Sequence, residues 1–147
     1  MPLQSFLKLN KLLVLVLLGG YVITVLEVRY VHDDILKEHR IAWTPIIYSL
    51  TMALLGAVAL AFWERGGRRF LFWGFALGMV IGPVGFWLHT GGQPFQGVLS
   101  LLSVWGRSVG AAESLGGPPA LAPLSLSGLG MLGMLACARR FQTDDRR

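Results

Sequence analysis

The sequence predicts an all-α integral membrane protein, with four transmembrane helices packed as an antiparallel up-down bundle. Hydrophobic residues make up 54% of the 147 residues and charged residues only 14%, and the mean hydropathy is +0.59. Four long intervals of the sequence are also nearly free of charged residues. Such intervals are typical of transmembrane helices, because a helix needs about 20 apolar residues to cross a bilayer. We therefore expect a single membrane domain over residues 1–147.

The predicted spans cover residues 12–28, 41–63, 70–88 and 121–138. Near the start of the second span, Thr44 is a suitable N-cap and Pro45 fits the first helical position. Lys8 and Lys11, followed by an apolar run, are typical of a secretory signal peptide. The run continues to Leu26 without an A-x-A-like cleavage site, so we expect the first span to be retained.

The distribution of basic residues predicts the orientation, because loops kept in the cytoplasm carry the excess of Lys and Arg. The segments on the N-terminal side hold Lys8, Lys11, Arg65, Arg68, Arg69, Arg139, Arg140, Arg146 and Arg147, whereas the opposite side holds Arg29, Lys37, Arg40 and Arg107. We therefore predict cytoplasmic N- and C-termini, in a membrane of the bacterial inner-membrane type. The basic residues anchor the chain to the lipid bilayer, and no basic stripe with interleaved aromatics indicates a nucleic-acid partner.

Two outer connections differ in kind. Residues 29–43, RYVHDDILKEHRIAW, form a charged outer hinge between the first two spans. Residues 90–120 form a longer outer loop, in which the apolar residues of the stretch 94–109 approximate helical spacing. We expect that stretch to form a short helix in the outer membrane interface, capping the bundle.

Small residues predict where helices approach closely, since helices in lipid associate through small-xxx-small rows. One row lies in the third span and another in the second, and we expect them to form a tight hairpin; contact with another subunit is the alternative. The rows are Gly74, Gly78 and Gly82, and Ala53, Ala57 and Ala61. The glycines of GLGMLG at residues 128–133 are predicted to pack in the fourth span, because no βαβ unit surrounds them.

Pro83 lies in the outer half of the third span and removes the hydrogen bond that its nitrogen would donate to the carbonyl of Met79. We expect a kink there. The kink is either ordinary irregularity of a membrane helix or a bend that opens a cavity next to His89.

The residues that could carry chemistry gather at the outer side, where His32, His39, His89 and Glu27 are expected to lie. Imidazole and carboxylate groups suit a transition metal. His32 and His89, at similar depth, could instead be axial ligands of a haem or hold a chlorophyll-type pigment. The alternative is that the histidines are interfacial residues hydrogen-bonded to neighbouring carboxylates. The single Cys137 excludes an internal disulfide and is read as a packing residue.

No catalytic motif is recognised in the chain, which favours a non-catalytic role. We predict a subunit or accessory factor of a larger membrane complex, or a homo-oligomer. The first alternative is a membrane protein that binds a metal, haem or chlorophyll-type pigment at its outer face. The second is a small transporter or channel subunit with a pathway past Glu27 and Pro83.

Overall fold

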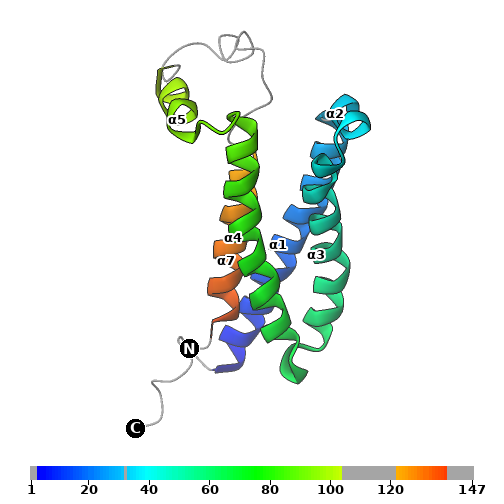
Figure 1. Cartoon of the computed structure of the whole chain (residues 1–147). Coiled ribbons are helices and arrows are strands. Elements are labelled where there is room, and N and C mark those ends of the chain that lie inside the picture. Colours follow the sequence, from blue (N-terminus) through cyan, green and yellow to red (C-terminus); the bar gives the residue numbers. More distant parts are fainter. Residues whose placement is uncertain (1–2, 32, 104–121, 139–147) are drawn as a thin grey trace.

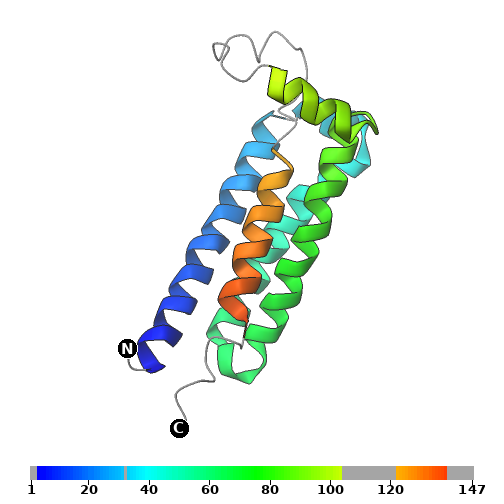
Figure 2. The same cartoon turned by 90° about the vertical axis from the view of Figure 1, so that its left-hand side faces the viewer.

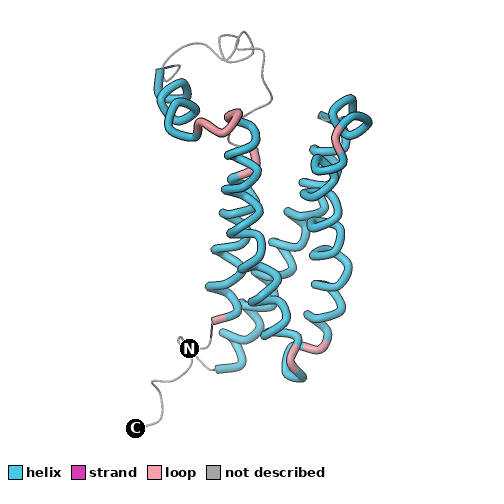
Figure 3. The backbone as a smooth tube through the Cα atoms, in the orientation of Figure 1, coloured by secondary structure: helices cyan, strands magenta, loops and turns pink. Residues whose placement is uncertain are grey.

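The computed structural model describes residues 3–31, 33–103 and 122–138. Every regular element in these ranges is a helix, and Figure 3 shows short turns between them. The elements are α1 (Leu3–Val31), α2 (Asp33–Glu38), the 3₁₀-helix η1 (Arg40–Trp43), α3 (Thr44–Ala61), the 3₁₀-helix η2 (Trp63–Arg65), α4 (Gly67–His89), α5 (Pro94–Ser103) and α7 (Leu124–Cys137). The predicted all-helical class is confirmed for this part of the chain.

Three helical stretches are long and apolar enough to cross a membrane. They are Lys8–Tyr30, Arg40–Ala61 and Gly67–His89, of 23, 22 and 23 residues. At about 1.5 Å per residue each is roughly 33 Å long, which matches a hydrocarbon core of about 30 Å. They coincide with the first three predicted spans, and their length and apolar composition support the predicted integral membrane protein. The helix in the fourth predicted span, α7, is apolar but has only 14 residues.

The four longest helices that pack together form two pairs, α1 with α3 and α4 with α7, and the pairs meet through α3–α4 and α1–α7 contacts. Figures 1 and 2 show the chain running up α1, down α3, up α4 and down α7. We call the end that carries α2 and α5 the outer end, and the opposite end the inner end. In Figure 1 the two pairs lie close at the inner end and separate toward the outer end.

The core lies in the inner and middle parts of the helices. Its fully buried side chains come from α1, α3 and α4, and the largest are Tyr21, Phe75, Leu71, Val14 and Ser49. The Tyr21 and Tyr48 hydroxyls are 3.0 Å apart, and the Tyr48 hydroxyl also donates to the Gly74 carbonyl over 2.9 Å. Because buried hydroxyls are costly without partners, these two bonds allow tyrosines to join α1, α3 and α4 inside the core.

The closest approach of the glycine row on α4 is to α7. A Cβ atom on Gly82 would lie 2.9 Å from the Pro123 carbonyl oxygen, and one on Gly78 would lie 3.1 Å from the Leu126 carbonyl oxygen. Gly74, by contrast, faces α3, where a Cβ would lie 2.7 Å from the Met52 sulfur. The row therefore packs against two helices, and the predicted hairpin with α3 accounts for only one part of it.

The alanine row on α3 lies elsewhere than expected. Ala57 and Ala61 are exposed and Ala53 is half-buried, whereas Met52 and Gly56 are buried. The predicted contact of this row with α4 is corrected accordingly: the interior face of α3 lies one residue earlier, about 100° around the helix. Contact of the alanines with another subunit stays a prediction.

The outer connections are helical in part. Residues 33–43 form α2 and η1, and α5 occupies the first part of the predicted interfacial helix. Residues 104–121 and His32 lie outside the described residues. Helix α3 begins at Thr44, so Trp43 takes the N-cap position predicted for Thr44. Helix α4 continues without interruption through Pro83, and a kink there stays a prediction.

Candidate functional site

A cavity of about 480 Å³ lies between the two helix pairs at the outer end. Its walls come from α1, α2, η1, α3, α4 and the start of α7, so residues from most of the chain meet there. Most of the lining side chains are apolar, and this size and lining are typical of small-molecule sites. The separation of the helix pairs toward this end is visible in Figure 1.

The cavity has a polar rim and an apolar interior. Glu27 lines it from the outer part of α1, His39 from the junction of α2 and η1, and His89 from the end of α4. Deeper residues of the wall, Val80 on α4 and Leu126 on α7, are apolar. A molecule in the cavity would therefore meet hydrogen-bonding groups near the membrane surface and hydrocarbon below them.

Helix α1 positions Glu27 through one continuous face. Tyr21 and Thr24 are buried and precede Glu27 at intervals of three residues, which keeps all three on one side of the helix. The Thr24 hydroxyl donates to the Gly20 carbonyl over 3.0 Å, so it is satisfied within its own helix. Glu27 forms no ion pair with another residue in the described ranges, because Arg29 turns to Asp33 instead.

His39 is held by the backbone of the segment between α2 and α3. Its N–H donates to the Ile35 carbonyl over 2.9 Å, and its carbonyl accepts the Ala42 N–H over 3.0 Å. The Trp43 indole N–H donates to the Leu36 carbonyl over 3.0 Å, which ties η1 back to α2. These bonds keep an exposed histidine at a defined place on the cavity rim.

His89 is the last residue of α4 and is half-buried. After it, the Thr90 hydroxyl donates to the Phe86 carbonyl over 3.0 Å. Gly91 and Gly92 then adopt φ values of +60° and +80°, which glycine reaches without the strain that a Cβ would cause. The chain therefore turns sharply at this point, and His89 stays at the cavity while α5 leads away.

The charged residues of α2 form an exposed cluster beside the site. Lys37 Nζ lies 2.6 Å from Asp33 Oδ2, and Arg29 also pairs with Asp33. Hydrogen bonds from Lys37 and then Arg29 lower the pKa of Asp33 from 3.8 to about 2. Hydrogen bonds that Lys37 donates to Asp33 and to Asp34 raise the pKa of Lys37. Asp33 and Lys37 therefore stay ionised at neutral pH, and the Arg29–Asp33 pair joins the end of α1 to α2.

The structure thus brings Glu27, His39 and His89 to one cavity, while His32 lies outside the described residues. In the described ranges no group of three or more His, Cys, Asp or Glu side chains is arranged to hold a metal ion. The predicted metal set and the predicted His32–His89 ligand pair therefore stay predictions. What the three rim residues can do together is donate and accept hydrogen bonds and supply one carboxylate charge.

Sequence reasoning did not find the apolar wall of this site. Val84 and Gly85 on α4 face residues before and at the start of α7, including Ala122 and Pro123. These residues are ordinary members of apolar segments, and their spacing along the chain carries no signal of a cavity. The only sequence feature that pointed here was Pro83, one residue before Val84.

Comparisons of the chain with protein-family models, curated proteins and solved structures find no match. Its function must therefore be inferred from the described helices and the cavity that they enclose.

Proposed function

We propose that the protein is a non-catalytic subunit or accessory factor of a membrane complex, and that its outer cavity binds a small amphipathic molecule. The observation that carries this proposal is the cavity of about 480 Å³ with an apolar interior and a rim of Glu27, His39 and His89. Such a site suits a molecule with an apolar body and a polar head. No chemical step is required of the rim residues.

The proposal includes four membrane crossings in a bacterial inner membrane, with both termini in the cytoplasm. Helix α7 supports a fourth crossing because two of its glycines, Gly130 and Gly133, pack closely along α4. A Cβ atom on Gly130 would lie 2.6 Å from the Phe75 carbonyl oxygen. Its length of 14 residues, about 21 Å, makes it the shortest of the four.

The charge at the rim indicates which kind of polar head group the bound molecule carries. Glu27 is the only acidic or basic residue, apart from the two histidines, among the residues that line the cavity in the described ranges. A carboxylate close to the hydrocarbon region is costly unless it is paired or reaches water. A head that carries hydrogen-bond donors or a positive charge would satisfy it, and the apolar wall would hold one hydrocarbon chain.

The test is to extract the protein in lipid nanodiscs, remove bulk lipid, and identify retained molecules by mass spectrometry. Val84→Trp should fill the cavity and reduce the retained amphiphile about tenfold, because the apolar part loses its space. Val58→Trp is the matched control, since Val58 is 56% exposed and Val84 53%, but Val58 does not line the cavity. Equal retention by both variants would contradict the proposed site.

A second substitution examines the head group. Glu27→Gln should weaken binding of a cationic or donor-bearing amphiphile about tenfold, as expected for a lost charge-assisted hydrogen bond. Glu38→Gln is the control, because Glu38 is a nearby exposed carboxylate that does not line the cavity. A larger effect of the Glu38 change would assign recognition to the general charge of the hinge instead.

A bound cofactor is the second candidate, and it is favoured by the presence of two histidines in one apolar cavity. His39 comes from the segment before η1 and His89 from the end of α4, so an axial ligand could come from either side. An absorption spectrum and elemental analysis of the gently extracted protein test this. A Soret or chlorophyll band that disappears in His89→Ala would show that the cavity ligand is a cofactor and not an amphiphile. A colourless, metal-free protein would exclude the cofactor.

The larger complex is tested separately. Native electrophoresis of mildly solubilised membranes should show the chain migrating with other proteins. If the chain migrates as a monomer and still retains its amphiphile, the proposed binding role stands and the proposed role as a subunit is rejected.

A further inference from the structure

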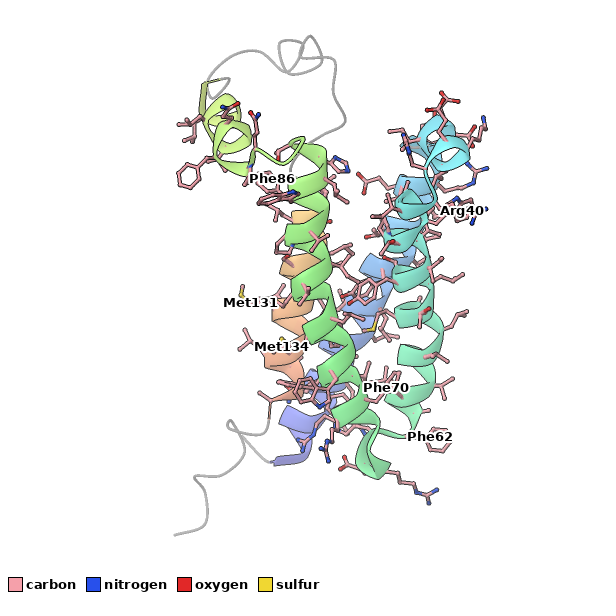
Figure 4. The ribbon with its side chains drawn as sticks, in the orientation of Figure 1. Arg40, Phe62, Phe70, Phe86, Met131 and Met134 are labelled. Atoms are coloured by element: carbon pink, nitrogen blue, oxygen red, sulfur yellow. The ribbon has the colours of Figure 1, made fainter. Side chains whose placement is uncertain are left out.

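A second hollow lies on the outside of the helix bundle, between α3 and α4 toward the inner end. It is a groove of about 510 Å³ that Thr51 and Met52 line from α3 and Arg69, Phe70, Trp73 and Leu77 line from α4. Figure 4 shows Phe70 near the inner end of α4 and Phe62 near the inner end of α3. The groove shares only the α3 and α4 scaffold with the outer cavity.

The groove is long, apolar and faces outward. From Arg69 to Leu77 it follows nine residues of α4, about 12 Å along the helix axis. Phe70, Trp73 and Leu77 are 48%, 63% and 52% exposed, so these side chains face lipid once the helices are in a membrane. Gly74 lies between them, and the Met52 side chain from α3 packs beside it to form the floor of the groove.

One end of the groove is cationic. Arg69 is the only charged residue that lines it in the described part of the chain. Arg69 also stands in the first turn of α4, which begins at Gly67, where the helix dipole favours an anion. Arg68 lies in the same turn, and Arg65 lies just before it in η2. The groove therefore complements an anionic amphiphile: the guanidinium at its surface end would attract the negative head, and the apolar part would hold the hydrocarbon chain.

We propose that this groove binds one anionic phospholipid. The phosphate pairs with Arg69, and one acyl chain lies along Phe70, Trp73 and Leu77. Arginine suits this role because its planar guanidinium can bind two phosphate oxygens at once. In the predicted orientation the inner end faces the cytoplasmic leaflet, and basic residues near such a surface attract its anionic lipids. The site depends on membrane insertion but not on a ligand in the outer cavity.

The test uses the full chain in nanodiscs made from equal amounts of phosphatidylglycerol and phosphatidylcholine, followed by native mass spectrometry of the released protein. The parent should retain phosphatidylglycerol over phosphatidylcholine by about tenfold, the ratio expected from one charge-assisted contact. Arg69→Gln should abolish this preference. Arg65→Gln, which changes an exposed arginine outside the groove, should keep it.

Groove filling provides a second, independent arm. Thr51→Trp should displace the acyl chain and lower total retained phospholipid about tenfold, whereas Leu50→Trp next to it should not, because Leu50 does not line the groove. Circular dichroism confirms the helical fold of each variant. Equal retention of both lipids by the parent, equal losses in the two arginine variants, or a dimer that excludes lipid from the groove would overturn the proposal.

Discussion

The inner and outer halves of the same four helices are built in opposite ways. In the inner and middle parts, Tyr21, Leu71 and Phe75 are fully buried and glycines bring α4 and α7 into backbone contact. In the outer part the helix pairs separate around a cavity with three titratable side chains at its rim. Figure 4 labels Phe86 and Arg40 near the outer end and Phe70 near the inner end.

The difference teaches where stability and binding reside. Helices in lipid gain little from the hydrophobic effect between them, so close packing and buried hydrogen bonds must hold them together. The buried contacts between the two helix pairs lie in the inner and middle parts, and the pairs separate beyond them. Within the second pair, α4 and α7 stay close up to the outer end, where Gly82 and Gly85 approach Pro123. Substitutions in the inner and middle parts should therefore change the free energy of unfolding, and substitutions at the outer cavity should change ligand binding.

The largest effect is expected from Gly130→Leu. The new Cβ would lie 2.6 Å from the Phe75 carbonyl oxygen and 3.1 Å from the Met79 nitrogen, so backbone must move. We expect the free energy of unfolding in detergent to fall by about 3 kcal/mol. Gly128→Leu, on the same helix with no atom within 4 Å of the added Cβ, should change it by less than about 0.5 kcal/mol. Similar values for both would show that α4–α7 packing is not close.

The tyrosine pair should have the next largest effect. Tyr48→Phe removes the hydroxyl that contacts Tyr21 over 3.0 Å and the Gly74 carbonyl over 2.9 Å. Because a buried partner is left unsatisfied, stability should fall by about 1–2 kcal/mol. Tyr30→Phe is the control, since Tyr30 is 89% exposed. If denaturant titrations of the two variants coincide, the hydroxyl network does not join the helices.

A substitution at the outer cavity should show the opposite behaviour, with a loss of binding and little change in stability. Val84→Trp should reduce bound amphiphile while changing the free energy of unfolding by less than about 0.5 kcal/mol, because Val84 does not pack in the core. Thermal unfolding of delipidated parent and variant measures this. A strong loss of stability without bound ligand would mean that the outer wall also holds the helices together.

The smallest effect concerns the exposed cluster on α2. The pKa of Asp33 is lowered from 3.8 to about 2, so folding favours its charged form. The stabilisation is therefore present above about pH 4 and is lost as the pH falls toward 2. Hydrogen exchange at residues 33–38, corrected for the intrinsic effect of pH, should show α2 opening in this window. In Asp33→Asn the transition should disappear, whereas Glu38→Gln should keep it.

Much of the fold follows from the sequence alone. Apolar length and the positions of charges predicted the three long helices, because crossing a hydrocarbon layer imposes a minimum run of uncharged residues. The helical start of the outer loop was predicted from the spacing of Phe95, Leu99 and Leu102. The glycines of α4 were recognised as packing residues, since a missing side chain matters wherever helices approach closely.

The tertiary structure alone decided which surfaces meet. The glycine row on α4 packs against α3 at Gly74 and against α7, about 45 residues later in the chain, at Gly82. The buried face of α3 contains Met52 and Gly56 instead of the alanine row. Likewise, the cavity joins Glu27, His39 and His89 with Val84 and Leu126. Periodicity defines the faces of each helix, but the rotation and separation of helices depend on side chains that fit together across distant segments. For that reason the sequence predicted the polar rim residues, and the apolar space behind them emerged only from the packing.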